Sequence, residues 1–137
     1  MYLLDTDTII FALKGNATVQ RNLRDHAREP LRISAITLME LYYGAHKSQK
    51  VASNLGKVRS LEAALEVIPV SQDMAEVFGV LKAGLEKAGS RLDDFDLIIA
   101  SCALSHNLIL VTNNVKHFEK IEGLKLANWT AYTKDIR

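Results

Sequence analysis

Short strand-like apolar runs alternate with longer helical stretches along most of the chain, and this alternation limits the possible folds more than any other feature. The strand-like runs cover residues 1–5 (MYLLD), 31–35 (LRISA), 66–70 (EVIPV), 108–112 (LILVT) and 124–126. Helical spacing of apolar residues covers residues 6–13, 37–47, 50–64, 72–88 and 94–106. We expect Gly15 to follow the end of the first helix and Asn107 to cap the last. The alternation predicts an α/β fold whose parallel sheet is covered by helices on both faces.

The size of the chain and its lack of targeting features predict one cytoplasmic domain. With 137 residues, of which 48% are hydrophobic, the chain can bury a core without covalent staples, so we expect residues 1–137 to form one domain. Cys102 is the only cysteine, and no internal disulfide can form. Asp5 and Asp7 interrupt the opening apolar run, which argues against a secretory signal. No apolar run approaches the roughly 18 residues of a membrane span.

The charge of the chain is nearly balanced but unevenly distributed. A formal net charge of +1 does not indicate the strongly basic surface of many nucleic-acid-binding domains. Residues 41–61 nevertheless contain four basic residues and no acidic one, and residues 14–32 contain five basic and two acidic residues. Each stretch fits either a contact with phosphates or a solvated helix face.

Asp5 ends the first strand-like run and directly precedes a helix. Because ligands of open α/β sheets bind beyond the carboxyl ends of the strands, this position favours a functional carboxylate. Asp5 also suits the N-cap of the following helix, and Asp7 in the first turn offsets the helix dipole. Taken alone, Asp5 fits either role.

Glu40 lies in a helix that is otherwise almost entirely apolar, within SAITLMELYYGA (residues 34–45). Apolar residues occupy two stripes of this helix, so we expect little of its surface to face solvent. A carboxylate buried among apolar side chains carries a large desolvation cost unless it is paired or binds a cation. A structural ion pair and a metal ligand both meet that requirement.

Three aspartates open the helix of DDFDLIIASCAL (residues 93–104). Asp93 or Asp94 suits the N-cap, where a carboxylate accepts backbone N–H groups. Asp96 falls on the buried side of the helix, beside small residues that leave room for a carboxylate to reach inward. Asp96 therefore fits both capping and a functional role.

Oxygen-rich side chains also follow the clearest strand, in VTNN (residues 111–114). A strand-to-helix turn capped by Thr112 or Asn113 is the ordinary explanation of such a motif. The motif stands, however, at the sheet edge where ligands of α/β folds bind, which makes Thr112 and Asn114 candidate site residues.

Combined, these positions predict one acidic pocket at the carboxyl edge of the sheet. Asp5 and Asn114 follow strands, whereas Glu40 and Asp96 lie on helices assigned to the same edge. Clustered carboxylates repel one another unless a cation neutralises them, and Mg²⁺ or Mn²⁺ prefers oxygen ligands. Zinc is not expected, because the four histidines show no ligand spacing with each other or with the cysteine: His26, His46, His106 and His117.

The order and spacing of several segments resemble the VapC toxins of the PIN-domain family. The segments are LLDT (3–6), SAITLMELYYGA (34–45), DDFDLIIASCAL (93–104), LVTNNVKHFEKI (110–121) and LKLANW (124–129). The resemblance implies a PIN-like three-layer α/β/α fold with a central parallel five-stranded sheet. It also implies an acidic pocket in which Asp5, Glu40 and Asp96 bind Mg²⁺ or Mn²⁺. Where many relatives carry a fourth acid this chain has Asn114, which weakens the case for a second tightly held ion.

The resemblance implies metal-dependent hydrolysis of RNA phosphodiester bonds, with tRNA as the expected substrate. Asp5 and Asp96 would hold the ion, and Glu40 would bind it or its water and act as general base. Asn114 and Thr112 would complete the catalytic set, with Thr112 and Asn113 positioning water or the phosphate.

A homodimer and a cognate VapB antitoxin are the partners that the resemblance implies. We expect the antitoxin to dock on the basic segment 41–61 and to push a basic side chain into the acidic pocket. Five apolar residues of the segment fit either that contact or the protein's own core: Tyr42, Tyr43, Val51, Leu55 and Val58.

Three other functions fit parts of the sequence. Residues 5–8 (DTDT) match the DxDxT opening of haloacid-dehalogenase-like phosphatases, whose metal-binding acids should follow the motif at Thr112. In this chain the acids of residues 93–96 precede that motif, so the order argues against a phosphatase. A metal-independent ribonuclease would attack with the 2′-hydroxyl and leave a cyclic phosphate. A catalytically silent PIN domain that binds RNA is favoured only by Asn114.

Overall fold

A five-stranded parallel sheet forms the centre of the computed structural model, which describes residues 1–131 of the chain. The strands are β1 (Tyr2–Leu4), β2 (Leu31–Ser34), β3 (Glu66–Ile68), β4 (Ile109–Val111) and β5 (Leu126–Ala127). Their order across the sheet is β3-β2-β1-β4-β5, and every neighbouring pair is parallel. The carboxyl ends of β2 and β4 therefore flank the end of β1.

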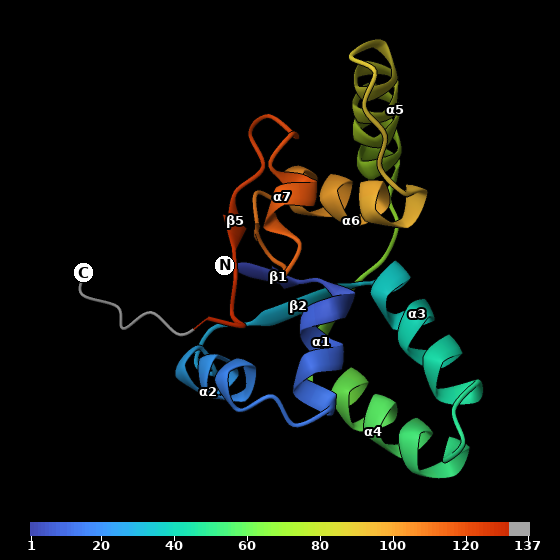
Figure 1. Ribbon diagram of the computed structural model, residues 1–137, viewed down its shortest axis with the longest axis vertical. Helices are drawn as coiled ribbons and strands as arrows, with labels where there is room; N and C mark the ends of the chain where they lie inside the picture. Colours follow the sequence, from blue (N-terminus) through green and yellow to red (C-terminus); the bar gives the residue numbers. More distant parts are fainter. Residues whose placement is uncertain (132–137) are drawn as a thin grey trace.

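Helices cover both faces of the sheet, which confirms the expected three-layer α/β/α fold (Figure 1). One layer contains α1 (Thr6–Leu13), α2 (Ala17–Asp25), α3 (Ala35–His46) and α4 (Val51–Ala64). The other layer contains α5 (Gln72–Lys87), α6 (Asp94–Ser105) and the short α7 (Val115–Phe118). No helix among residues 1–131 combines the length and the apolar character needed to cross a membrane.

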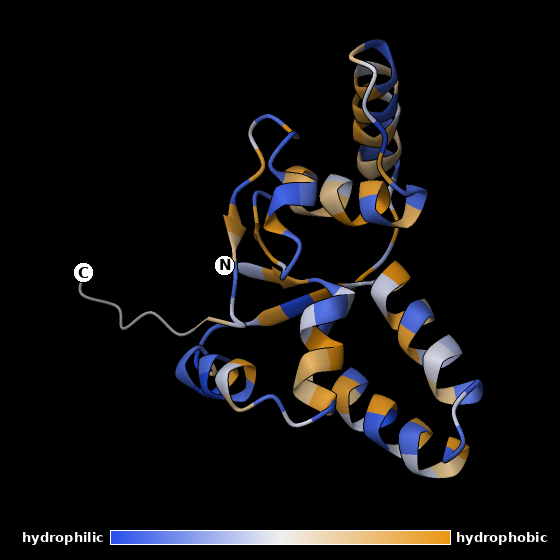
Figure 2. Cartoon of the chain, in the orientation of Figure 1, coloured by the Kyte–Doolittle hydropathy of each residue, from blue (hydrophilic) through white to orange (hydrophobic). Residues whose placement is uncertain are grey.

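Two hydrophobic cores, one on each face of the sheet, explain this layering. Successive residues of a strand point to opposite faces, so the two leucines of β1 serve different cores. Leu3 packs with Ile99 of α6, whereas Leu4 packs with Ile9 of α1 and Leu41 of α3. Figure 2 shows hydrophobic and hydrophilic residues alternating around most helices, as expected of helices with one buried face.

Helix α2 was not predicted from the sequence. Asn16 caps it by accepting a hydrogen bond from the backbone N–H of Val19 at 3.0 Å, but most of its residues are polar. Asn22 is buried because its Nδ2 donates to the backbone oxygen of Trp129 at 3.0 Å. A contact between residues so far apart in sequence leaves no local pattern of apolar residues. Helix α2 could therefore not be predicted from the spacing of its apolar residues.

The end of α6 agrees with the prediction for Asn107. Asn107 has a positive φ of 52°, and its N–H donates to the Leu104 oxygen at 3.3 Å. The next N–H, of Leu108, donates to the Ala103 oxygen at 2.8 Å. This pair of bonds is the Schellman ending, which satisfies the last carbonyls of the helix and turns the chain into β4.

Helix α3 is more exposed than the sequence indicated. Met39 is 57% and Tyr43 65% exposed, so the expectation that little of this helix faces solvent was wrong. The reason is that α3 packs against α1 and α4 through its other face, where Leu41 is buried. In the segment 41–61, Val58 is buried in the core, and Tyr42, Leu55 and Leu61 pack against that core.

Candidate active site

The predicted carboxylates come from three elements and lie at the carboxyl edge of the sheet. Asp5 directly follows β1, Glu40 is in the second turn of α3, and Asp96 is in the first turn of α6. Burial raises the pKa of both Asp5 and Glu40, and the negative charge of Asp96 raises both further. The fold therefore brings these three residues, far apart in sequence, close enough to influence one another.

Asp5 is buried, with an exposed fraction of 3%, and both of its oxygens accept hydrogen bonds. As N-cap of α1, it accepts from the Thr6 backbone N–H at 2.7 Å through Oδ1. Its Oδ2 accepts from Thr112 Oγ1 at 2.8 Å. Burial is the largest cause that raises the pKa of Asp5 to about 6, and the charges of Asp7 and Asp96 add to it. Asp5 therefore caps α1, and its negative charge is unfavourable because the carboxylate is buried beside other acids.

Glu40 reaches the same edge from α3 and is held by threonine. Thr6 Oγ1 donates to Glu40 Oε1 at 2.8 Å, and the same hydroxyl lies 3.0 Å from Thr37 Oγ1. Partial burial is the largest cause that raises the pKa of Glu40, and the negative charge of Asp96 raises it further. Among the salt bridges of the described residues none involves Glu40, so the structural ion pair considered from the sequence is not formed there.

Asp96 is paired with a histidine, His117, for which no role at the site was predicted from the sequence. His117 Nε2, on α7, lies 3.0 Å from Asp96 Oδ2. Burial raises the pKa of Asp96, whereas the hydrogen bond and charge of His117 lower it. A sequence signal for His117 did exist, since it follows Asn114 by three residues and so returns to the same edge after one helical turn.

Thr112 and Asn114 connect β4 to the acidic residues of α1. The buried Thr112 hydroxyl donates to Asp5 and accepts from the backbone N–H of Asn114 at 3.0 Å. Asn114 Nδ2 donates to Asp7 Oδ2 at 2.6 Å. Asn113 is turned the other way, where its Oδ1 accepts from Thr130 Oγ1 at 3.1 Å. The amide of Asn114, which stands where many relatives carry a fourth acid, therefore donates to the carboxylate of Asp7.

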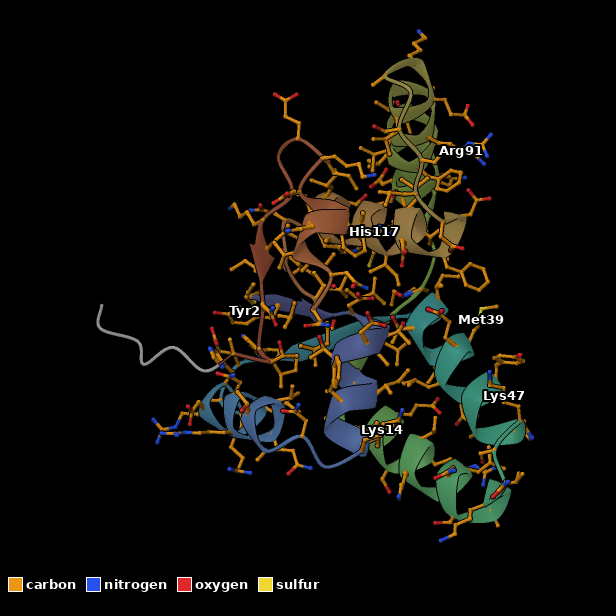
Figure 3. The ribbon with its side chains drawn as sticks, viewed as in Figure 1. Tyr2, Lys14, Met39, Lys47, Arg91 and His117 are labelled. Atoms are coloured by element: carbon orange, nitrogen blue, oxygen red, sulfur yellow. The ribbon has the colours of Figure 1, made fainter. Side chains whose placement is uncertain are left out.

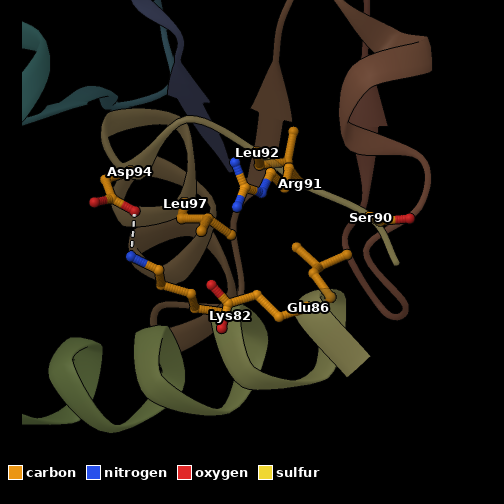
Figure 4. A pocket seen from close by; sticks show the side chains of 8 residues that line it. Lys82, Glu86, Ser90, Arg91, Leu92, Asp94 and Leu97 are labelled. Atoms are coloured by element: carbon orange, nitrogen blue, oxygen red, sulfur yellow. Dashed lines mark hydrogen bonds and ion pairs between the residues drawn. The ribbon is translucent and has the colours of Figure 1, made fainter. Parts of the chain in front are cut away.

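Asp93 and Asp94 have roles of their own outside this arrangement. Asp93 is the N-cap of α6 and accepts from the Phe95 backbone N–H at 2.8 Å. Asp94 forms an exposed ion pair with Lys82 of α5 at 2.9 Å, in the groove between α5 and α6 (Figure 4). Asp94 therefore adds no contact to the cluster of Asp5, Glu40 and Asp96.

The chemistry of the acidic cluster fits a hard divalent cation, although the oxygens do not surround a common point. Within residues 1–131, no three Asp, Glu, His or Cys side chains are grouped closely enough to hold a metal ion. Asp5, Glu40 and Asp96 instead each accept a hydrogen bond from a neighbouring side chain. Because Mg²⁺ usually keeps several water ligands and binds through one or two carboxylates, a complete protein shell is not required for it.

Comparison with known proteins adds a family to this geometry. A model described as PIN domain matches residues 2–124. A "tRNA(fMet)-specific endonuclease VapC" of Shigella flexneri is 35% identical over 129 residues, which cover 94% of this chain and 98% of the relative. A "Ribonuclease VapC2" of Rickettsia felis is 38% identical over 131 residues, 94% of this chain and 98% of the relative. The crystal structure of VapBC2 from Rickettsia felis, bound to a DNA fragment from its promoter, contains a chain with a TM-score of 0.89 and 38% identity, covering 93% of this chain and 98% of that one.

Proposed function

The chain belongs to the PIN-domain family and, within it, to the VapC proteins, and on this premise we propose that it is a metal-dependent endoribonuclease. It is the toxin of a VapBC toxin–antitoxin pair and hydrolyses phosphodiester bonds of tRNA in the cytoplasm. Support comes from relatives named as ribonucleases, which align with nearly the whole chain. Support also comes from the acidic cluster at the carboxyl edge of the sheet.

The buried carboxylate of Asp5 is the observation on which the proposal depends. A side chain that is 3% exposed and has a pKa of about 6 is costly for a folded protein to keep ionised. Capping alone does not require it, because Ser34 and Ser71 cap α3 and α5 in the same fold without a charge. Strongly perturbed acids gather where a protein uses them, so the position supports a functional role.

Asp5 and Asp96 would hold the ion directly, and Glu40 would bind the ion or its water. When bound, Mg²⁺ or Mn²⁺ supplies positive charge that activates water and stabilises the negative charge developing on the phosphate. Thr112 fixes the carboxylate of Asp5, and Thr6 fixes that of Glu40.

Glu40 acts as general base in this proposal. Its raised pKa makes its carboxylate a better proton acceptor than an exposed glutamate, and it takes a proton from the attacking water. Water adds to phosphorus, the bond to the 3′ oxygen breaks, and the proton is passed to that leaving oxygen. The products therefore carry a 5′-phosphate and a 3′-hydroxyl.

A VapB antitoxin and a second copy of the chain are the proposed protein partners. A groove of about 560 Å³ runs between α1, α3 and α4, and residues of segment 41–61 from Leu41 to Val58 contribute to its lining. Leu13 and Leu41 give it an apolar wall, and Glu40 lines it as well. An antitoxin segment in this groove would have the acidic cluster within reach of a basic side chain, which would compete with the ion.

Cleavage of total tRNA by the purified protein tests the proposal. We expect cleavage in Mg²⁺ or Mn²⁺ and none in EDTA. Asp5→Asn and Asp96→Asn should each lower the rate by about 100-fold or more, the usual loss when a charge-stabilising group is removed. Asp94→Asn is the matched control, because Asp94 opens the same helix as Asp96 but pairs with Lys82 outside the cluster.

Three results would contradict the mechanism. These are cleavage in EDTA, product ends with a cyclic phosphate, and full activity of both cluster variants. A wild-type protein that binds RNA in the presence of the ion but never cleaves it would favour the catalytically silent alternative.

A further inference from the structure

A second groove borders the acidic cluster, and its wall is built from exposed apolar side chains. The groove has a volume of about 610 Å³ and lies between α1, α3 and the start of α6. Tyr43 is 65%, Met39 57% and Phe95 43% exposed, and all three line it. Large apolar side chains gathered in one exposed place commonly mark a binding site rather than a packing defect.

The arrangement of α3 explains why these side chains are available. Met39, Tyr43 and Lys47 are four residues apart, so they form one stripe along the helix. Figure 3 shows Met39 and Lys47 on the outer side of α3, away from α1 and α4. Phe95 enters the groove from α6, where its backbone N–H is already bound by the Asp93 cap. None of these side chains is needed to complete the two cores.

Lys47 and the ring of Tyr43 give the groove two features that suit a nucleotide, beside the two acids at its border with the cluster. Asp7 and Glu40 line it, so an occupant of the groove lies next to the acidic cluster. Lys47 also lines it, and its Nζ is 5.0 Å from the centroid of the Tyr43 ring. A flat aromatic surface beside one cation matches the two parts of a nucleotide, an uncharged base and a phosphate.

We propose that the rings of Tyr43 and Phe95 stack on an unpaired nucleobase of the RNA and thereby position the neighbouring phosphodiester bond at the acidic cluster. Lys47 contacts a phosphate of the same strand. The inference rests on the proposed function, because it assumes that RNA reaches the cluster. Stacking on an aromatic ring requires a base that is free of pairing, so the substrate is cut in a loop or single-stranded segment. Every base has an aromatic face, and the groove therefore tolerates different sequences.

Fluorescence of a hairpin RNA that carries 2-aminopurine in its unpaired loop tests the stacking directly. Binding is measured in Mg²⁺ with Asp5→Asn as background, so that the RNA is not consumed, while cleavage is measured without that change. We expect binding to quench the fluorescence. Phe95→Ala and Tyr43→Ala should each weaken RNA binding by about tenfold and reduce the quenching, within the range measured for base–aromatic stacking.

Conservative substitutions separate stacking from simple apolar contact. Phe95→Tyr and Tyr43→Phe keep the ring and should retain affinity and quenching. Phe95→Leu keeps the bulk but loses the ring, and should behave like Phe95→Ala. Val80→Ala is the matched control, because Val80 is a 70% exposed apolar residue of α5 that does not line the groove. Folding of each variant is checked by thermal unfolding.

Several outcomes overturn the inference. Unchanged quenching in Phe95→Ala and Tyr43→Ala would show that the base lies elsewhere. RNA affinity and quenching of Phe95→Leu equal to those of the wild type would show that the groove makes an apolar contact with the RNA but does not stack on a base. A halved molecular mass of the alanine variants in light scattering, with quenching unchanged per bound RNA, would assign the rings to a contact between protein copies. Absence of RNA binding by the wild type would refute both the stacking and the proposed hydrolysis. Quenching by a wild-type protein that never cleaves the RNA would instead support the stacking and refute only the hydrolysis.

Discussion

Replacement of Asp5 by asparagine should stabilise the metal-free protein at alkaline pH, although it removes a helix cap. Burial and neighbouring acids raise the pKa of Asp5 from 3.8 to about 6. Ionising such a group costs the folded state about 3 kcal/mol relative to the unfolded chain. Asp5→Asn removes this cost. The amide oxygen can still accept from the Thr6 N–H, while the altered contact with Thr112 costs about 1 kcal/mol.

The pH dependence of the free energy of unfolding tests this prediction more specifically than a measurement at one pH. Between the unfolded pKa and the folded pKa of about 6, the folded protein binds the proton that the unfolded chain has lost. Stability of the wild type therefore falls as pH rises through this window, and the contribution from Asp5 changes by about 1.5 kcal/mol between pH 5 and pH 8. The altered hydrogen bond does not titrate, so it cancels when the two proteins are compared at the two pH values.

Urea unfolding in EDTA at pH 5 and pH 8 measures the effect. The stability of Asp5→Asn relative to the wild type should increase by about 1.5 kcal/mol from the lower to the higher pH. Asp94→Asn is the matched control, since that acid is exposed and paired with Lys82 outside the cluster. Mg²⁺ should stabilise the wild type at pH 8 more than Asp5→Asn, because a ligand of the folded state raises its stability. A difference between wild type and Asp5→Asn that is the same at both pH values would refute the reasoning.

Three further substitutions test the contacts between α1 and the segment that contains β4 and Asn114. Thr112→Val keeps the shape but leaves the Asn114 N–H without its acceptor, so we expect a loss of about 1–3 kcal/mol in urea unfolding together with reduced tRNA cleavage. Thr8→Val, which removes a buried hydroxyl bound to the Val111 oxygen, should cost stability but leave cleavage unchanged, and equal effects on cleavage would contradict the role of Thr112. Asn114→Asp replaces the 2.6 Å bond to Asp7 with repulsion, so it should lower stability in EDTA and tighten Mg²⁺ binding in calorimetry. Weaker Mg²⁺ binding by this variant would show that the added charge lies outside the ion's reach.

The sheet could be predicted from the sequence because its signals are local. Residues 108–112 form a continuous apolar run, as a strand buried on both faces requires, and most of this run became β4 next to β1. Helix α2 could not be predicted in the same way, since Asn22 is buried through the backbone of Trp129. The exposure of Tyr43 was also missed, because periodicity shows which residues are apolar but not whether another element covers them.

The location of the candidate site was predictable, whereas its hydrogen bonds were not. Parallel strands end at one edge, so the positions of Asp5 and Asn114 followed from the topology alone. The spacing of His117 from Asn114 could have placed it at this edge, but its bond to Asp96 depends on the direction of α7, which four residues of sequence do not determine. The topology indicated the edge at which these residues lie, and tertiary packing decides which of their atoms bond.

The hydrogen bond between Thr112 and Asp5 joins residues that are 107 positions apart, and this has a consequence for synthesis of the protein. The backbone N–H of Asp5 also donates to the oxygen of Val111, so β1, which already pairs with β2, gains its second neighbour only when β4 has been made. A nascent chain that still ends before residue 112 lacks both contacts. A translating ribosome must therefore synthesise the chain as far as Thr112 before the acidic cluster can assemble.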